Sequence, residues 1–261
     1  MTDLAPSAAR RFFRGLGRTV LAGIVVVAML IVGFLVYANM VARGERDAAI
    51  EAWTNPAVAI ESTDHSIVMS PTGTTGSDSG TGLVFIPGAK VDPYAYLFVL
   101  SGIVEREGLT VVITKPTLNL AFFDFRPLTT FTNDAPEIAT WFVGGHSLGG
   151  VRACMLASDS SGDPGVAGLV LFGSYCATDL TGTRLDVLSV GGSEDGLSTP
   201  KKIADATSLL PPSVTVIEIE GLNHAGFGNY GPQAGDGVAT ITSAQARTAI
   251  TNALADFFGS R

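Results

Sequence analysis

The chain has 261 residues, and its 24 Asp and Glu outnumber its 16 Lys and Arg, which gives a net charge of −8 at pH 7. Since a domain usually needs about 100–200 residues, this length fits one domain with a tail or two small domains, and one core is the simpler interpretation. The acidic excess lies after residue 46, where 22 acidic residues stand against 10 basic ones. A protein that binds nucleic acid needs a basic face, so we exclude nucleic acid as a partner.

The first 46 residues contain a basic stretch and then an apolar one. From Thr19 to Ala42 the chain carries no charge and consists mostly of Val, Ile, Leu, Ala and Met. About 20 apolar helical residues cross the hydrocarbon core of a bilayer, and residues 20–37 with their flanks reach this length. The more basic side of such a helix usually stays in the cytoplasm. Four arginines precede the run and two follow it, namely Arg10, Arg11, Arg14, Arg18, Arg43 and Arg46.

We therefore predict a basic cytoplasmic N-terminus over residues 1–18, a transmembrane signal anchor over 19–41, a helical or irregular stalk over 42–55 and a globular domain over 56–261. The alternative to the anchor is a cleaved secretory signal, because Val36-Tyr37-Ala38 and Met40-Val41-Ala42 are acceptable cleavage sites. The apolar run is longer than the roughly 7–15 residues of most signals, which favours an anchor in the cell membrane. Both interpretations place the domain outside the cytoplasm.

After Pro56, runs rich in Val, Ile and Phe alternate with stretches compatible with helices. This pattern is typical of a mainly parallel sheet covered by helices on both faces, an α/β architecture. We predict eight strands, near residues 58–61, 66–70, 82–86, 110–114, 140–144, 168–172, 186–190 and 215–218. Helices are expected near residues 93–107, 136–138, 149–157, 201–208 and 243–258. The stretch 72–82, rich in Gly, Ser and Thr, is interpreted as a hairpin loop.

The strongest local motif is Gly145-His146-Ser147-Leu148-Gly149, which follows an apolar run and matches G-x-S-x-G. In this pattern a serine occupies a tight turn between a strand and a helix, where glycines avoid collisions with the neighbouring backbone. Ser147 is therefore the predicted nucleophile, and the backbone N–H of Leu148 is a predicted donor to a negatively charged substrate oxygen. The alternative is a chance match in a chain with 31 glycines.

A serine nucleophile needs an imidazole that accepts its proton and a carboxylate that orients the imidazole. His224 is the predicted base because it follows an apolar run in a polar loop, whereas the side chain of His146 is expected to point away from the site. Asp195 is the predicted acid in the turn after another apolar run. Glu194 is the alternative if that turn is rotated by one residue, while Asp186 lies at the wrong end of its strand.

The loop Pro87-Gly88-Ala89-Lys90 follows the third predicted strand, and we predict that the N–H of Ala89 is the second oxyanion donor. A plain strand-to-helix turn is the alternative. With these motifs in this order, the chain resembles a bacterial branch of the α/β-hydrolase superfamily, similar to dienelactone hydrolases and small esterases. The resemblance covers about residue 57 to the end. It implies an α/β-hydrolase fold with a triad of Ser147, Asp195 and His224.

Ten residues, 175–184, separate the sixth and seventh predicted strands, where many lipases insert a lid, so we expect no large lid. Cys154 and Cys176 either form a disulfide or remain free in the core. We expect no metal site and no cofactor, because neither a ligand spacing nor a G-x-G-x-x-G fingerprint is present. Four phenylalanines are expected in the core rather than in an acyl pocket: Phe122, Phe123, Phe125 and Phe131.

These observations predict a membrane-anchored, extracytoplasmic serine hydrolase that cleaves a small-molecule carboxylic ester or thioester through an acyl-serine intermediate. Its expected partners are that ester and the membrane. Since a fold hosts many functions, two alternatives remain. One is a non-catalytic, surface-displayed binding module with a hydrolase fold, and the other is a peptidase or carbon–carbon hydrolase.

Overall fold

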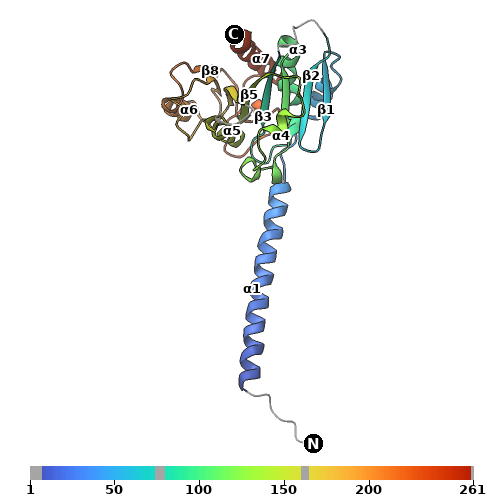
Figure 1. Cartoon of the computed structure of the whole chain (residues 1–261), viewed down its shortest axis with the longest axis vertical. Helices are drawn as coiled ribbons and strands as arrows, with labels where there is room; N and C mark the ends of the chain where they lie inside the picture. Colours follow the sequence, from blue (N-terminus) through green and yellow to red (C-terminus); the bar gives the residue numbers. More distant parts are fainter. Residues whose placement is uncertain (1–7, 74–79, 160–164, 260–261) are drawn as a thin grey trace, which may run out of the picture. The chain divides into compact units, whose positions relative to one another are not determined.

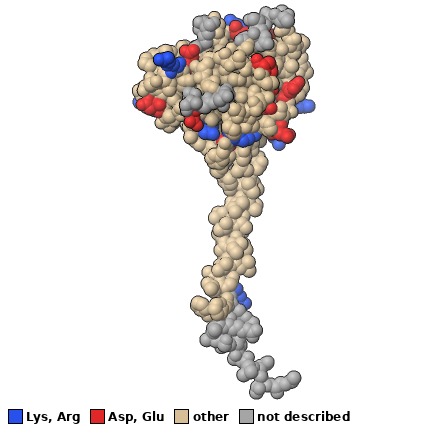
Figure 2. Space-filling view, viewed as in Figure 1, with Lys and Arg blue, Asp and Glu red and all other residues tan. Residues whose placement is uncertain are grey.

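The computed structural model describes residues 8–73, 80–159 and 165–259, and the chain divides into two units, Met1–Met40 and Val41–Arg261 (Figure 1). Residues 1–7 of the predicted basic N-terminus lie outside the described residues. The first unit contains α1 (Ala8–Asn39), in which Leu16–Asn39 has a mean hydropathy of 2.9. Figure 2 shows an almost uncharged surface along this helix. Among the described residues it is the one helix long and apolar enough to cross a membrane, a test that a signal sequence also passes.

The second unit is built on one eight-stranded sheet, and all eight predicted strands are present. The sheet is mixed: β2 runs antiparallel to its neighbours β1 and β4, and the strands from β3 to β8 pair in parallel. The order across the sheet is β1-β2-β4-β3-β5-β6-β7-β8. The strands are β1 (Val58–Ser62), β2 (Ser66–Pro71), β3 (Thr81–Ile86), β4 (Thr110–Thr114), β5 (Thr140–His146), β6 (Val166–Phe172), β7 (Asp186–Gly192) and β8 (Thr215–Ile219).

The predicted hairpin at residues 72–82 is wrong. β4 lies between β2 and β3, so the stretch connects two strands that are not paired. Its residues 74–79 lie outside the described residues. A Gly-rich turn signal shows that the chain reverses or bends, but it does not show which strand becomes the neighbour.

Helices cover both faces of the sheet, as predicted. Successive strand residues point to opposite faces, so the apolar strands fill two cores. Leu83 and Phe85 share one core with α3 (Leu97–Glu107) and α7 (Ser243–Gly259), and Val143 shares the other with α5 (Leu148–Ser158). The remaining helical segments are α2 (Arg46–Trp53), α4 (Thr129–Thr132), α6 (Pro200–Ala206), η1 (Pro93–Tyr96), η2 (Thr117–Asn119), η3 (Ala121–Phe123), η4 (Thr207–Leu209) and η5 (Ala225–Phe227).

The predicted stalk, residues 42–55, is instead part of the second unit. The N–H of Ala42 donates to the carbonyl of Lys90, and the N–H of Glu45 donates to the carbonyl of Asn229. Ala52 of α2 is buried in the same core as α3. The alternating charges and alanines of residues 42–55 suggest a solvated stalk. A short helix with a narrow apolar side gives a weak sequence pattern, so its packing against the domain could not be predicted.

The predicted helix at residues 136–138 is wrong, and the short α4 lies four residues before it. Residues 133–137 form turns and a bend, with the N–H of Ala135 bonded to Thr132 and that of Ile138 bonded to Ala135. Pro136 has no N–H, which interrupts consecutive helical hydrogen bonds. The connection between β6 and β7, residues 173–185, contains no helix, so the absence of a large lid is confirmed.

Candidate active site

Ser147 lies at the sharp turn between β5 and α5, as the glycine pattern predicts. Its φ of 52° and ψ of −123° are unusual for a residue with a side chain. A Cβ on Gly145 would lie 2.5 Å from the carbonyl carbon of Gly149, and a Cβ on Gly149 would lie 2.1 Å from the carbonyl oxygen of Ile86. Only glycines fit at these two positions, and the partly exposed Ser147 side chain projects from the turn between them.

His224 and Asp195 meet beyond the ends of β8 and β7. Nδ1 of His224 lies 2.7 Å from Oδ2 of Asp195, and both side chains are almost fully buried. The other carboxylate oxygen, Oδ1, accepts the N–H groups of Leu197 at 2.8 Å and Ser198 at 2.7 Å. These bonds fix the carboxylate, which in turn orients the imidazole with Nδ1 as its donor. The alternative acid, Glu194, has a side-chain contact with Ser193 instead.

Nε2 of His224 is buried and has no hydrogen-bond partner among the described residues. No hydrogen bond therefore joins this nitrogen to Ser147 in the structure. A buried nitrogen whose ring is oriented by a carboxylate is an available proton acceptor.

Asp236 is a second carboxylate at this loop, and the sequence analysis assigned it no role as a hydrogen-bond acceptor. Its Oδ1 accepts the N–H of His224 at 3.0 Å and the N–H of Gly196 at 3.2 Å, and its Oδ2 accepts the N–H of Ala225 at 2.9 Å. Asp236 thus ties the turn after Asp195 to the loop of His224. Its position in a Gly-Asp-Gly turn was the only signal in the sequence.

The two predicted oxyanion donors flank the turn of Ser147. Leu148 begins α5, and the carbonyls of Ile86 and Pro87 pack against Gly149, which brings the loop of Ala89 beside the turn. Within the described part of the chain, neither the N–H of Ala89 nor that of Leu148 donates a hydrogen bond. Both groups are thus available for a substrate oxygen, while the preceding Gly88 N–H is already bonded to Tyr96.

The expectation that the His146 side chain points away from the site is wrong. The ring of His146 is fully buried, and its centroid lies 4.4 Å from that of His224. Alternation along β5 directs the side chain into the core below Ser147, and the loop of His224 packs over this part of the core. Burial, and next the neighbouring His224, lower the pKa of His146 well below its usual range, so this ring stays neutral.

Three of the four phenylalanines after β4 lie at the surface, contrary to the expectation of a core position, which is confirmed only for Phe131. Phe122 and Phe123 are partly exposed and Phe125 is 83% exposed, whereas Phe131 is buried. The N–H of Lys90 donates to the carbonyl of Asn119 at 2.8 Å, so this aromatic loop adjoins the loop of Ala89. It thus supplies apolar surface near the candidate oxyanion donors.

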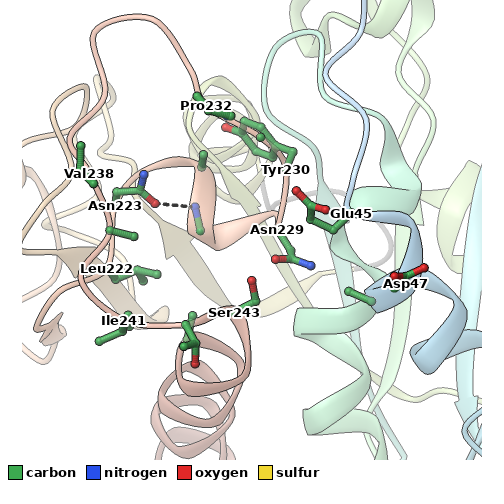
Figure 3. A pocket seen from close by; sticks show the side chains of 17 residues that line it. Glu45, Asp47, Leu222, Asn223, Asn229, Tyr230, Pro232, Val238, Ile241 and Ser243 are labelled. Carbon is green, nitrogen blue, oxygen red and sulfur yellow. Dashed lines mark hydrogen bonds between the residues drawn. The ribbon is translucent and has the colours of Figure 1, made fainter.

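A groove of about 540 Å³ lies beside the loop of His224 (Figure 3). Leu222, Asn223 and Tyr230 line it on one side and Glu45 on another, and none of Ser147, Asp195 and His224 lines it. The side chain of Asn223 accepts the N–H of Gly226, the dashed bond in Figure 3. The groove is therefore separate from the candidate triad.

Elsewhere, a disulfide joins Cys154 of α5 to Cys176, which follows β6.

The chain belongs to the alpha/beta hydrolase family, whose sequence pattern matches residues 82–248. No curated protein sequence matches it. A predicted CIB-like hydrolase from Thermoplasma acidophilum is similar in structure, with a TM-score of 0.56 and 12% identity over 78% of this chain and 100% of that chain. A dienelactone hydrolase from Anabaena variabilis has a TM-score of 0.55 and 15% identity over 78% and 98%. A bacterial membrane phospholipase A has a TM-score of 0.51 and 14% identity over 95% and 99%. The α/β-hydrolase fold and the resemblance to dienelactone hydrolases and esterases are confirmed, and both support a hydrolase.

Proposed function

We propose that this hydrolase cleaves a carboxylic ester or thioester with Ser147 as nucleophile, His224 as base and Asp195 as acid. Oγ of Ser147 attacks the carbonyl carbon while Nε2 of His224 takes its proton. The N–H groups of Ala89 and Leu148 stabilise the oxyanion. His224 then gives the proton to the leaving alcohol or thiol, and water activated by His224 releases the acid from the acyl-serine.

The observation that carries this proposal is the buried pair of His224 and Asp195 together with a serine in a strained turn. Nε2 of His224 has no partner in the described parts of the chain. Strain at such a residue persists only where the surroundings impose it, and it is frequent at reactive sites. The exposed Phe122, Phe123 and Phe125 favour an apolar acyl or alcohol group beside the site.

We further propose that α1 anchors the protein in the cell membrane with the hydrolase domain outside the cytoplasm. The apolar helix and the four arginines before it, against two after it, support this orientation. Protease added outside intact cells should then degrade the domain. Protection of the domain until the cells are opened would contradict this orientation, and release of a shortened domain into the medium would indicate a cleaved signal.

The test of the catalytic proposal is to label the full-length protein in detergent with a fluorescent fluorophosphonate and to follow hydrolysis of short p-nitrophenyl esters. Ser147→Ala should lose both labelling and turnover. Ser158→Ala, on the same helix with an exposed side chain, is the matched control and should keep both. A folded wild type that neither labels nor hydrolyses esters would favour the binding-module alternative.

A further inference from the structure

Two buried side chains that take no part in the proposed chemistry lie below the candidate site. The hydroxyl of Tyr96 accepts the N–H of Gly88 at 2.8 Å and lies 2.9 Å from Nδ1 of His146. Tyr96 and His146 are both 0% exposed. Gly88 immediately precedes the candidate donor Ala89, and His146 immediately precedes Ser147. One hydroxyl thus connects the two loops that form the site.

The direction of the bond between Tyr96 and His146 follows from counting donors and acceptors. If Tyr96 donates to Nδ1, the one group of this pair left without a partner among the described residues is the Nε2–H of His146. If Nδ1–H donates to Tyr96 instead, both the tyrosine proton and the bare Nε2 lack a partner. A buried polar group without a partner is unfavourable, so the first arrangement, which leaves one such group rather than two, is favoured. The hydroxyl therefore accepts from Gly88 and donates to a neutral His146.

This arrangement decides which amide of the loop faces the substrate. The N–H of Gly88 is occupied by Tyr96, which leaves the N–H of Ala89 as the next available donor. The contact is close: a Cβ on Gly88 would lie 2.9 Å from Nδ1 of His146 and 3.3 Å from the Tyr96 hydroxyl. The loop, the tyrosine and the histidine are thus packed as one unit.

We propose that Tyr96 and His146 are a positioning pair that holds the N–H of Ala89 at a fixed distance from Ser147. The inference rests on the proposed function and deepens it. Neither side chain exchanges a proton with the substrate in this role, although the ring of His146 packs against that of His224. The pair acts through the loop of Gly88 and Ala89, so its loss displaces a transition-state donor while the substrate-binding surface stays in place.

The first test is Tyr96→Phe in the full-length protein, which removes the hydroxyl but keeps the ring that packs on Phe85. We expect kcat to fall about 10- to 100-fold, since a displacement of about 1 Å can cost 10²-fold, and KM to change less than about threefold. Tyr94→Phe is the matched control, because the one bond of this exposed hydroxyl within the described part of the chain is to Ser62. Equal kcat in wild type and Tyr96→Phe would overturn the proposal.

A second pair of variants separates positioning from packing. The amide oxygen of His146→Asn can accept the tyrosine hydroxyl, whereas His146→Leu cannot. We expect His146→Asn to keep at least about tenfold more activity than His146→Leu. We also expect Tyr96→Phe combined with His146→Leu to be no slower than His146→Leu alone, because the two residues act as one unit. Additive losses would contradict a shared role.

Hydrogen exchange provides a readout that does not need turnover. Peptides that contain residues 87–90 should exchange faster in Tyr96→Phe than in wild type or Tyr94→Phe, because the N–H of Gly88 loses its acceptor. Unchanged exchange overturns the positioning pair even if the enzyme is active. A wild type without labelling or turnover, but with the expected change in exchange, overturns the proposed function and leaves the structural lock intact.

Discussion

His224 is held by two carboxylates that bind different parts of it. Asp195 bonds the ring at Nδ1, and Asp236 bonds the backbone N–H. The first contact fixes the tautomer and can stabilise a positive imidazolium, while the second fixes the loop. Only the first contact changes in strength when the ring takes a proton, so the two carboxylates should affect catalysis differently.

Asp195→Asn should lower kcat by about 10³- to 10⁴-fold with little change in KM, because an amide can donate to Nδ1 and favour the wrong tautomer. The measurement is steady-state hydrolysis of a p-nitrophenyl ester by the folded variant. Glu194→Gln is the neighbouring control and should stay within about threefold of wild type. A larger loss in Glu194→Gln than in Asp195→Asn would transfer the role to Glu194.

At the residue scale, the sequence predicted the candidate nucleophile, base and acid because each follows an apolar run in a recognisable turn. The roles of Tyr96 and Asp236 were not predicted because they depend on partners 50 and 12 residues away in the chain. The predicted direction of the His146 side chain was wrong because the loop that covers this side chain, the loop of His224, follows another strand. Local patterns indicate residue types, whereas contacts between loops arise only from the fold.

At the scale of elements, α3 and α7 pack against each other where Gly102 faces Thr251. A Cβ on Gly102 would lie 2.1 Å from Oγ1 of Thr251, a buried hydroxyl without a partner among the described residues. Gly102→Ala should therefore lower the free energy of unfolding by about 1–3 kcal/mol through overpacking. Adding Thr251→Ala removes the colliding atom and should restore most of the loss. Thermal unfolding of both single variants and the double variant measures the coupling, and simple additivity of the losses would contradict the collision.

The disulfide links α5 to the segment after β6 and closes a loop with a sequence separation of 22 residues. A crosslink that closes a loop of this length stabilises the folded protein by about 3 kcal/mol, chiefly because it restricts the unfolded chain. Reductant should lower the unfolding midpoint of wild type but not that of a variant with Cys154→Ala and Cys176→Ala. Identical midpoints for wild type and the variant, without reductant, would show that the crosslink contributes nothing.

At the scale of the whole molecule, the eight strands could be predicted from their apolar runs, but their order could not. β3 lies between β4 and β5, and nothing local to residues 72–82 indicates that β4 separates β2 from β3. The domain boundary was also misplaced, since the charges of residues 42–55 suggest a solvated segment. In the fold a Cβ on Gly44 would lie 2.6 Å from Cα of Ala95, so this segment packs directly on η1.

This packing makes the start of the domain testable by truncation. A chain that begins at Val41 keeps the hydrogen bonds of Ala42 and Glu45 and the burial of Ala52, so it should be soluble and match the ester turnover of the full-length protein within about threefold. A chain that begins at Pro56 loses the segment that packs on η1, the short helix that contains Tyr96. Its unfolding midpoint should fall by at least about 5 °C, since 1 kcal/mol shifts a domain of this size by about 2–4 °C, and kcat should fall with it. If the two truncated chains are equally stable and active, residues 42–55 contribute nothing to the folded domain and are a stalk after all.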